Sequence, residues 1–462
     1  MAQKLRISAS EDWLLDTPAD GMVSGALPRM KVATRPLRSK PWAMPYFRLA
    51  AAIVLGNALM LTVNLRGGDW RLIDGTALNA LSALTLLNLT AAVLIRHQQV
   101  LNALFTLAGR GRSSWPMWLR WSISKVHHVG GIHVGAALSG TAWLLAFAVV
   151  THVARARHPE AVTVTTVVLA DVLAVLGAVV VVGAAPAVRA RAHNVFESTH
   201  RWGGWTAIGV FWVLTIHLAA VHPVEGFGQA LVSDWKTWVL ALLTASVASP
   251  WLRLRKVPVQ VERPSGHAAI VSFDYGVTPR GPSAVGVSRS PLKEWHAFAA
   301  VVTPKRSGYR ILVSRAGDWT GRFIDDPPSH LWIRGKPVAA PMAKVALLHK
   351  RVVYVVTGSG IGPCLGQILA AEVPAQLVWS TRSPRKTFGD ALVDEVLSVQ
   401  PDAVIWDTTE RGKPDLLHLV RKAYREFDAE AVFVVSNKAA TFRLVEGLER
   451  DGIPAFGPIW DS

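Results

Sequence analysis

Cysteine is nearly absent from this sequence of 462 residues, and acidic residues are scarce relative to basic ones. The single cysteine, Cys364, excludes an intrachain disulfide framework and any metal site built from cysteine alone. Residues 1–45 also lack an apolar run that would serve as the core of a signal peptide. Residues 1–46 are therefore expected to form a basic, cytosolic N-terminal extension.

Asp and Glu number 32 against 49 for Lys and Arg, which gives a net charge of +17. Such a surplus is typical of proteins that meet nucleic acid, acidic lipid or the inner side of a membrane. The hydrophobic fraction of 51% and the mean hydropathy of +0.29 favour a membrane protein. Because the positive charge lies mainly beside apolar segments, no nucleic-acid partner is expected, and the lipid bilayer is the expected partner.

Six apolar segments in residues 47–256 are each close to the length needed to cross a bilayer. They cover residues 48–65, 76–95, 129–151, 162–185, 202–221 and 234–251. Basic residues gather between the second and third segments, between the fourth and fifth, and after the sixth. The positive-inside rule therefore predicts a multi-pass membrane protein with both termini in the cytoplasm. The short apolar run 101–107 is interpreted as an interfacial or re-entrant piece.

The composition changes at residue 257. Short alternating runs in residues 257–344 predict a small antiparallel β-barrel, with strands at 268–273, 298–302 and 309–314. From residue 345 to 462, strand runs alternate with helical patterns, which predicts a parallel α/β domain. Its strands are expected at 352–356, 376–379, 403–406 and 431–435, and its helices at 390–399, 416–427 and 441–451.

A glycine-rich turn follows the first strand of this predicted sheet, with the sequence Gly358-Ser359-Gly360-Ile361-Gly362-Pro363. A strand, a glycine turn and a helix together present backbone N–H groups to a phosphate. Glycines also make tight turns that bind nothing, so the motif alone leaves both readings open. Arg382, Arg385 and Lys386 follow the second strand, where the 2′-phosphate of NADPH would be met; a solvated basic loop is the alternative.

Two further motifs occur in the predicted barrel, Trp295-His296-Ala297-Phe298-Ala299 and Gly317-Asp318-Trp319-Thr320. With the glycine turn, and in this order, they resemble the flavin and NADPH motifs of the ferric reductase and NADPH oxidase superfamily. The resemblance runs from about residue 48 to the C-terminus. It implies a six-helix transmembrane bundle followed by a ferredoxin-reductase-like module of barrel and nucleotide-binding domain.

The resemblance also implies cofactors and the residues that hold them. FAD would be held by His296 and Phe298, with Arg334 and Gly335 near its pyrophosphate and Trp460 over its ring. NADPH would be held by the glycine turn. Three departures from the family motifs weaken these assignments. In the flavin motif, Ala299 replaces a hydroxyl residue and Ala297 replaces a proline. After the last predicted strand, Ser436-Asn437-Lys438 stands where the family has Cys-Gly-Pro.

Histidines in the third and fifth predicted spans are candidate axial ligands of haem b, as the resemblance implies. The inner pair would be His133 with His200, and the outer pair His152 with His217. The residue separations along the two spans correspond to roughly 28 and 26 Å at about 1.5 Å per residue, nearly the full thickness of the hydrocarbon layer. This spacing favours one haem or none over two.

The expected activity is therefore electron transfer from NADPH through FAD toward the membrane, to an acceptor that the sequence does not name. The departures from the motifs support a rival hypothesis, a non-redox membrane sensor or interaction protein that retains the reductase scaffold. Solute transport with a histidine relay is the third hypothesis, and it has less support because the spans show no paired Gly/Pro-broken segments.

Overall fold

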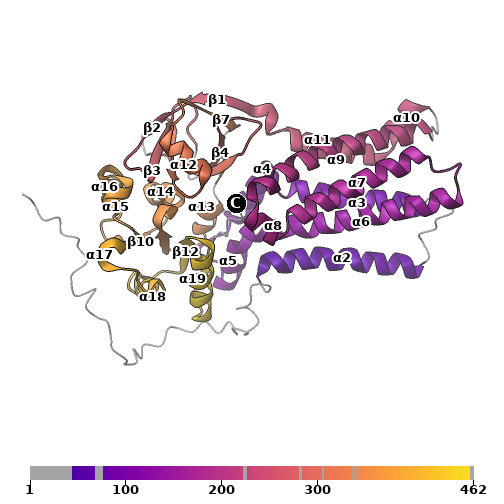
Figure 1. The fold of residues 1–462 in the computed structure, drawn as a ribbon. Coiled ribbons are helices and arrows are strands. Elements are labelled where there is room, and N and C mark those ends of the chain that lie inside the picture. Colours follow the sequence, from indigo (N-terminus) through magenta and orange to yellow (C-terminus); the bar gives the residue numbers. More distant parts are fainter. Residues whose placement is uncertain are drawn as a thin grey trace, which may run out of the picture. The chain divides into compact units, whose positions relative to one another are not determined.

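The computed structural model describes residues 44–67, 76–221, 226–279, 283–303, 306–335, 338–339 and 341–457 (Figure 1). The chain divides into two compact units. The helical unit comprises Pro41–Leu101 and His128–Arg253, and the C-terminal unit combines Leu254–Ser462 with the segment Asn102–His127. Trp460 and most of the N-terminal extension lie outside the described residues.

The helical unit is built on α2 (Pro45–Gly67), α3 (Thr76–Leu94), α6 (Gly130–Arg157), α7 (Val164–Gly183) and α9 (His193–Val221). Its shorter helices are α8 (Pro186–Arg191), α10 (Phe227–Ser233) and α11 (Trp235–Ala248), and α4 (Gln98–Ala108) crosses from this unit into the segment Asn102–His127. Among the described residues, five helical stretches are long and apolar enough to span a membrane. The sixth predicted span corresponds to α11, which has only 14 residues and is not one of the five, so a six-helix bundle is not confirmed.

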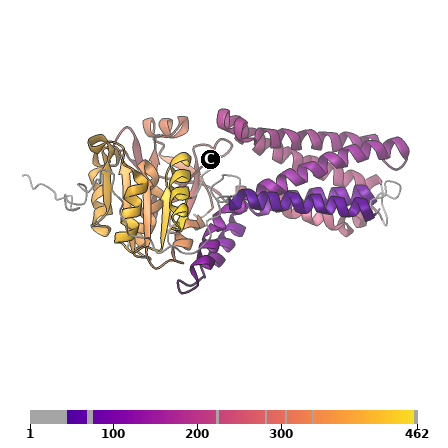
Figure 2. The same cartoon turned by 90° about the horizontal axis from the view of Figure 1, so that it is seen from below.

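Small residues let the helices of this unit approach closely, and the long helices run side by side in both views (Figures 1 and 2). A Cβ on Gly131 would lie 2.0 Å from the carbonyl oxygen of Tyr46. The amides of Asn57 and Asn88 hydrogen-bond each other at 2.9 and 3.2 Å, and Trp143 Nε1 donates to Asn57 Oδ1 at 2.8 Å. Close approach of small residues and polar contacts are the usual means by which apolar helices associate.

Two antiparallel sheets form the first part of the C-terminal unit, as the barrel prediction expected. One contains β1 (Leu254–Pro258), β7 (His330–Arg334), β4 (Ser283–Ser288), β5 (His296–Ala300) and β8 (Val338–Ala339). The other contains β2 (Gln260–Glu262), β3 (Ala268–Phe273) and β6 (Tyr309–Ser314). Helix α12 (Asp318–Asp325) contributes Trp319, Phe323 and Ile324 to their common core.

The remainder forms a five-stranded parallel sheet in the order β11-β10-β9-β12-β13, which confirms the predicted α/β arrangement. The strands are β9 (Val352–Thr357), β10 (Ala375–Thr381), β11 (Val404–Asp407), β12 (Ala431–Val435) and β13 (Ala455–Phe456). The helices are α13 (Pro341–Ala346), α14 (Ile361–Ala370), α15 (Pro384–Phe388), α16 (Asp390–Val399), α17 (Thr408–Arg411), α18 (Leu416–Glu426) and α19 (Lys438–Arg450).

Strand β9 is buried on both faces, which explains its uninterrupted apolar sequence. Val352, Tyr354 and Val356 belong to the core beneath α14 and α16. Val353 and Val355 belong to the core beneath α18 and α19. Helices therefore cover both faces of the sheet, as Figure 2 shows. Ligand sites in such sheets lie at the carboxyl ends of the strands.

The segment Asn102–His127, which the sequence places between two spans, is part of the C-terminal unit. Its helix α5 (Met117–Ser124) buries Trp121 in the core that contains β9 and α14. Arg120 Nη1 lies 2.7 Å from Glu430 Oε2 and donates to the carbonyl of Leu348 at 3.0 Å. Lys125 Nζ pairs with Glu449 at 2.6 Å. The module is thus assembled from two separate stretches of chain.

His349 lies under this segment, with Nε2 3.2 Å from Ser124 Oγ and 2% of its surface exposed. Burial lowers the pKa of His349 to about 4, and the positive charge of Arg120 acts in the same direction. The imidazole is therefore neutral at pH 7. In the unfolded chain its pKa would return to about 6.5.

The imidazole takes up a proton at a higher pH in the unfolded chain than in the folded one. The stability of the C-terminal unit is therefore expected to fall as the pH drops from about 6.5 to 4. The loss attributable to His349 is at most about 3 kcal/mol. Thermal unfolding of the purified chain at pH 7 and pH 4.5 checks this, with His349→Gln expected to show a shallower pH dependence. His330→Gln, at an exposed position, serves as the control. Parallel pH curves for the wild type and His349→Gln would contradict the expectation.

Candidate functional site

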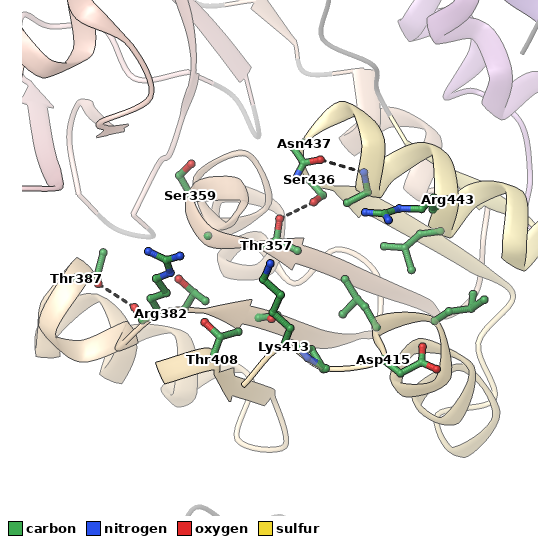
Figure 3. Close-up of a pocket in the computed structure, with 18 of the residues that line it drawn as sticks. Thr357, Ser359, Arg382, Thr387, Thr408, Lys413, Asp415, Ser436, Asn437 and Arg443 are labelled. Carbon is green, nitrogen blue, oxygen red and sulfur yellow. Dashed lines mark hydrogen bonds between the residues drawn. The ribbon is translucent and has the colours of Figure 1, made fainter. Parts of the chain in front are cut away.

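A cavity of about 900 Å³ opens at the carboxyl ends of β9, β10, β11 and β12 (Figure 3). Its wall includes Thr357, Gly358 and Ser359 after β9, and Ser380, Thr381 and Arg382 at the end of β10. Further lining residues are Thr408 and Lys413 after β11, with Ser436, Asn437 and Arg443 after β12. The cavity is large enough for a nucleotide and lies where parallel sheets bind one.

The glycine turn adopts a geometry that needs its glycines. Gly358 has a φ of +50°, and a Cβ there would meet no atom within 4 Å. A Cβ on Gly360 would lie only 2.3 Å from the carbonyl oxygen of Val435, at the end of β12. Trp379 Nε1 donates to the carbonyl of Gly358 at 3.0 Å, which holds the turn from below. The turn is therefore packed tightly against the sheet on one side and open on the other.

Gly362 and Pro363 continue this turn into the first helical turn of α14, which begins at Ile361. A Cβ on Gly362 would lie 3.3 Å from Leu312 of β6, so this glycine allows α14 to approach the barrel. Proline is tolerated in a first helical turn because its missing N–H would have no partner within the helix. The first turn of a helix is in general suited to an anion, because its N–H groups have few partners within the helix.

Ser436 and Asn437, which follow β12 where the sequence resemblance implied Cys-Gly-Pro, have defined roles in the structure. The hydroxyls of Ser436 and Thr357 lie 2.5 Å apart and join the carboxyl ends of β12 and β9. Asn437 Oδ1 accepts from the N–H of Ala440 at 3.0 Å and so caps α19. These residues leave polar groups, and no thiol, at this end of the cavity.

Three cations line the cavity, and sequence reasoning singled out only one of them. Arg382 directly follows β10, Lys413 lies in the loop after α17, and Arg443 lies on α19; Figure 3 shows Lys413 between the other two. Within the described parts of the chain, none of the three side chains makes an ion pair. Lys413 and Arg443 follow the third and fourth predicted strands, where ligand-binding residues of such sheets occur. This position in the sequence would have pointed to both as ligand-binding candidates.

Arg385, the other predicted 2′-phosphate ligand, is not among the residues that line the cavity. Its guanidinium pairs with Asp390 at 2.9 Å and Asp394 at 2.7 Å. These carboxylates, Asp394 foremost, raise the pKa of Arg385. The structure therefore brings Arg382 together with the glycine turn and holds Arg385 against α16.

The two barrel motifs meet in one aromatic cluster. The ring centroids of His296 and Trp319 lie 4.1 Å apart, and those of Phe298 and Trp319 lie 6.1 Å apart. Trp319 is only 8% exposed. Thr320 accepts hydrogen bonds from the N–H groups of Ala316 and Gly317 at 2.9 and 3.0 Å, which fixes the start of α12.

Arg334 and Gly335 lie at the end of β7, next to this cluster. The guanidinium of Arg334 is 3.9 Å from the ring centroid of Trp295, and Gly335 has a φ of +68°. Ala297 and Ala299 point to the other face of β5 and have no polar side-chain atoms. Within the described residues, the two barrel motifs therefore bring together aromatic rings and one cation, and Ala297 and Ala299 add no side-chain hydrogen-bonding groups.

The two predicted pairs of haem ligands have different surroundings within the helical unit. The rings of His133 and His200 face each other across α6 and α9, with centroids 6.2 Å apart. His133 Nδ1 lies 2.8 Å from the carbonyl oxygen of Ala92. This contact orients the imidazole ring so that Nε2 points away from Ala92. The planes of the two rings are inclined by 31°, and the inner histidines are close neighbours in the helical unit.

The outer pair is engaged with other groups. His152 Nε2 lies 3.0 Å from both carboxylate oxygens of Asp171 on α7. His217 Nε2 lies 2.7 Å from Thr163 Oγ1, the residue that caps α7. The structure thus joins each outer histidine to α7 rather than presenting the two as a pair.

Comparison with known proteins adds to this geometry. Residues 342–462 match the sequence model described as adenylate-forming reductase 03009, C-terminal domain. Two curated relatives from Coprinopsis cinerea, adenylate-forming reductases 06235 and 03009, are each 42% identical over 388 and 390 residues. Each match covers 83% of this chain, so it includes part of the helical unit, but the chain spans only 37% of each relative's length.

Solved structures resemble part of the chain at low overall similarity. A ferredoxin NADP+ reductase from Neisseria gonorrhoeae with bound FAD and NADP is 13% identical, with a TM-score of 0.35. The likeness covers 45% of this chain and 99% of that one. The flavohem-like FAD/NAD binding domain of a nitric oxide dioxygenase from Vibrio cholerae is 11% identical, covers 44% and 99% of the two chains, and has a TM-score of 0.32.

Proposed function

We propose that this chain is a membrane-embedded oxidoreductase that takes electrons from NADPH and passes them through FAD toward the bilayer. The observation that carries the proposal is the cavity at the carboxyl edge of the parallel sheet, where a glycine turn meets three cations that form no ion pair with any described residue. The two curated relatives are named reductases, which supports the same class of activity. The electron acceptor is left open.

In this proposal the NADPH pyrophosphate lies on the backbone of Gly358, Ser359 and Gly360. Arg382 and Lys413 receive the 2′-phosphate, because neither side chain is neutralised by a carboxylate of the described residues. Flavin is held beside His296 and Phe298, with Arg334 and Gly335 at its pyrophosphate. NADPH supplies a hydride, and flavin supplies the ability to divide the electron pair into single electrons.

The helical unit is the proposed membrane domain, since five of its helical stretches are long and apolar enough to cross a bilayer. The basic inner connections place both termini on the cytoplasmic side in this proposal. If haem is present, His133 and His200 are the residues that would hold it, and it would carry single electrons into the bilayer. His152 and His217 are left out of this role because Asp171 and Thr163 already engage their ring nitrogens.

The relatives' names add a proposal about context. The stretch of each relative that this chain matches is a minor part of its length. We assign the reductase part of the name to the matched stretch, and the adenylate-forming part to the length that lies outside it. The chain would then supply electrons to a reaction whose substrate is first activated as an adenylate.

The test uses the full chain, purified in detergent, with 2′,5′-ADP and 5′-ADP as probes. The wild type is expected to prefer 2′,5′-ADP, and Lys413→Met should weaken its binding about tenfold while leaving 5′-ADP unchanged, because a charge-assisted contact is lost. Arg385→Met is the matched control, with little effect expected on either probe. The same preparation should show a flavin absorption band near ~450 nm and reduce a dye with NADPH.

If neither probe binds and no flavin is retained, the reductase proposal fails, and the chain would instead be a scaffold without redox activity. If both probes bind equally well to the wild type and to Lys413→Met, NADPH preference is wrong while dinucleotide binding stands.

A further inference from the structure

The segment that joins α3 to α6 has two faces with different surroundings. Arg120, Trp121 and Ser124 are buried against the C-terminal unit. Trp118 and Ser122, four residues apart and therefore on one side of α5, are exposed. Trp118 is 64% exposed, and Trp115, just before the helix, is 38% exposed. One side of α5 is thus packed against the rest of the C-terminal unit, and the other side carries Trp118, which the described residues leave largely exposed.

The surroundings of these tryptophans are basic and partly apolar. Arg110 and Arg112 are exposed, and no carboxylate within the described residues pairs with either. Leu107, at the end of α4, is 65% exposed. Large exposed aromatic and aliphatic side chains beside free cations are unusual for a surface that meets only water.

The chain connections indicate what covers this surface. The helical stretch Met117–Arg157 is one of the five candidate spans, so α5 continues through the 3-10 turn Lys125–Val129 into the candidate membrane helix α6. At the other end, α4 follows α3, which is also a candidate span. The segment is therefore tied to the bilayer on both sides. Tryptophan is enriched at the level of the lipid headgroups, and arginine is attracted to acidic lipid.

We propose that residues 107–122 lie in the headgroup layer of an acidic membrane surface. Trp115 and Trp118 sit at the boundary between headgroups and acyl chains, and Arg110 and Arg112 meet lipid phosphates. The inference rests on the membrane placement in the proposed function and is independent of the redox activity. It gives α5 two partners, lipid on one side and the nucleotide-binding sheet on the other.

The single cysteine makes a spectroscopic test direct. Cys364 has 0% exposure, so an introduced surface cysteine is the site that a thiol-reactive fluorophore labels. The full chain with Trp118→Cys is labelled, reconstituted in vesicles of mixed phosphatidylcholine and phosphatidylserine, and quenched with lipid that carries a headgroup nitroxide. Glu410→Cys, exposed on α17 at the cavity edge of the sheet, is the matched control. Val172→Cys, on candidate span α7, reports insertion with an acyl-chain nitroxide.

Quenching at position 118 is expected to exceed that at position 410 several-fold. Arg110→Gln with Arg112→Gln should lower quenching at position 118 when phosphatidylserine is present, and should change little in vesicles without it. Equal, weak quenching at positions 118 and 410, with strong quenching at 172, overturns this inference alone. Absence of quenching at 172 overturns the membrane placement in the proposed function.

Discussion

Replacing Gly360 by alanine is expected to abolish nucleotide binding and to destabilise the C-terminal unit by about 1–3 kcal/mol. The new Cβ would lie 2.3 Å from the carbonyl oxygen of Val435, a backbone atom that no side-chain rotation can move aside. The turn or the end of β12 must shift. Either movement disturbs the contact between Thr357 and Ser436 that joins β9 to β12 at the cavity.

Two measurements check this expectation: affinity for 2′,5′-ADP and the midpoint of thermal unfolding. Gly266→Ala is the matched control, because a Cβ there meets no atom within 4 Å and its backbone is outside the left-handed region. That variant should behave as the wild type does. A Gly360→Ala protein with undiminished affinity would show that the turn does not cradle the nucleotide.

Removing Arg120 is expected to have the second large effect. Its side chain is 7% exposed, and it pairs with Glu430, which is 22% exposed. Arg120→Met removes the donor from the Glu430 carboxylate and from the carbonyl oxygen of Leu348, and both acceptors are largely buried. Breaking one side of a buried pair typically costs about 3–5 kcal/mol. Thermal unfolding of the C-terminal unit in the full chain should therefore occur at a clearly lower temperature.

A double-mutant cycle separates the pair from the packing around it. The unfolding free energy is measured for Arg120→Met, for Glu430→Gln and for the double variant. The double variant should be less destabilised than the sum of the two single variants. Arg450→Met, which removes an exposed partner of Glu446, is the control and should cost no more than about 0.5 kcal/mol. Strict additivity of Arg120→Met and Glu430→Gln would mean that the two residues act independently.

Local patterns were enough to predict much of this fold. The strands at 268–273, 309–314 and 431–435 and the helix at 390–399 have the predicted bounds, because apolar periodicity and flanking turn residues determine them locally. α11 differed because the apolar run 234–251 includes Pro250 and residues beyond Ala248 that leave the helix. Hydrophobicity alone does not report where a helix ends.

The site was harder to predict, because it depends on which charges pair. Arg382 and Arg385 look alike in the sequence, and only the packing of α15 beside α16 brings Asp390 and Asp394 to Arg385. The histidines show a similar limit. His133 and His200 face each other in the structure, whereas His152 is paired with a carboxylate on a different helix. Sequence spacing measures distance along one helix and says little about its neighbours.

The C-terminal unit is built from two separate stretches of chain, and this limits how it can be transferred to another protein or produced as a shorter fragment. A gene fragment that starts at residue 254 would encode the sheets and the cavity but not Trp121, Arg120 or Lys125. The product would expose the apolar site that Trp121 fills and leave Glu430 and Glu449 without their cations. Recombination that transfers this C-terminal unit between proteins must therefore carry the segment Asn102–His127 along with it.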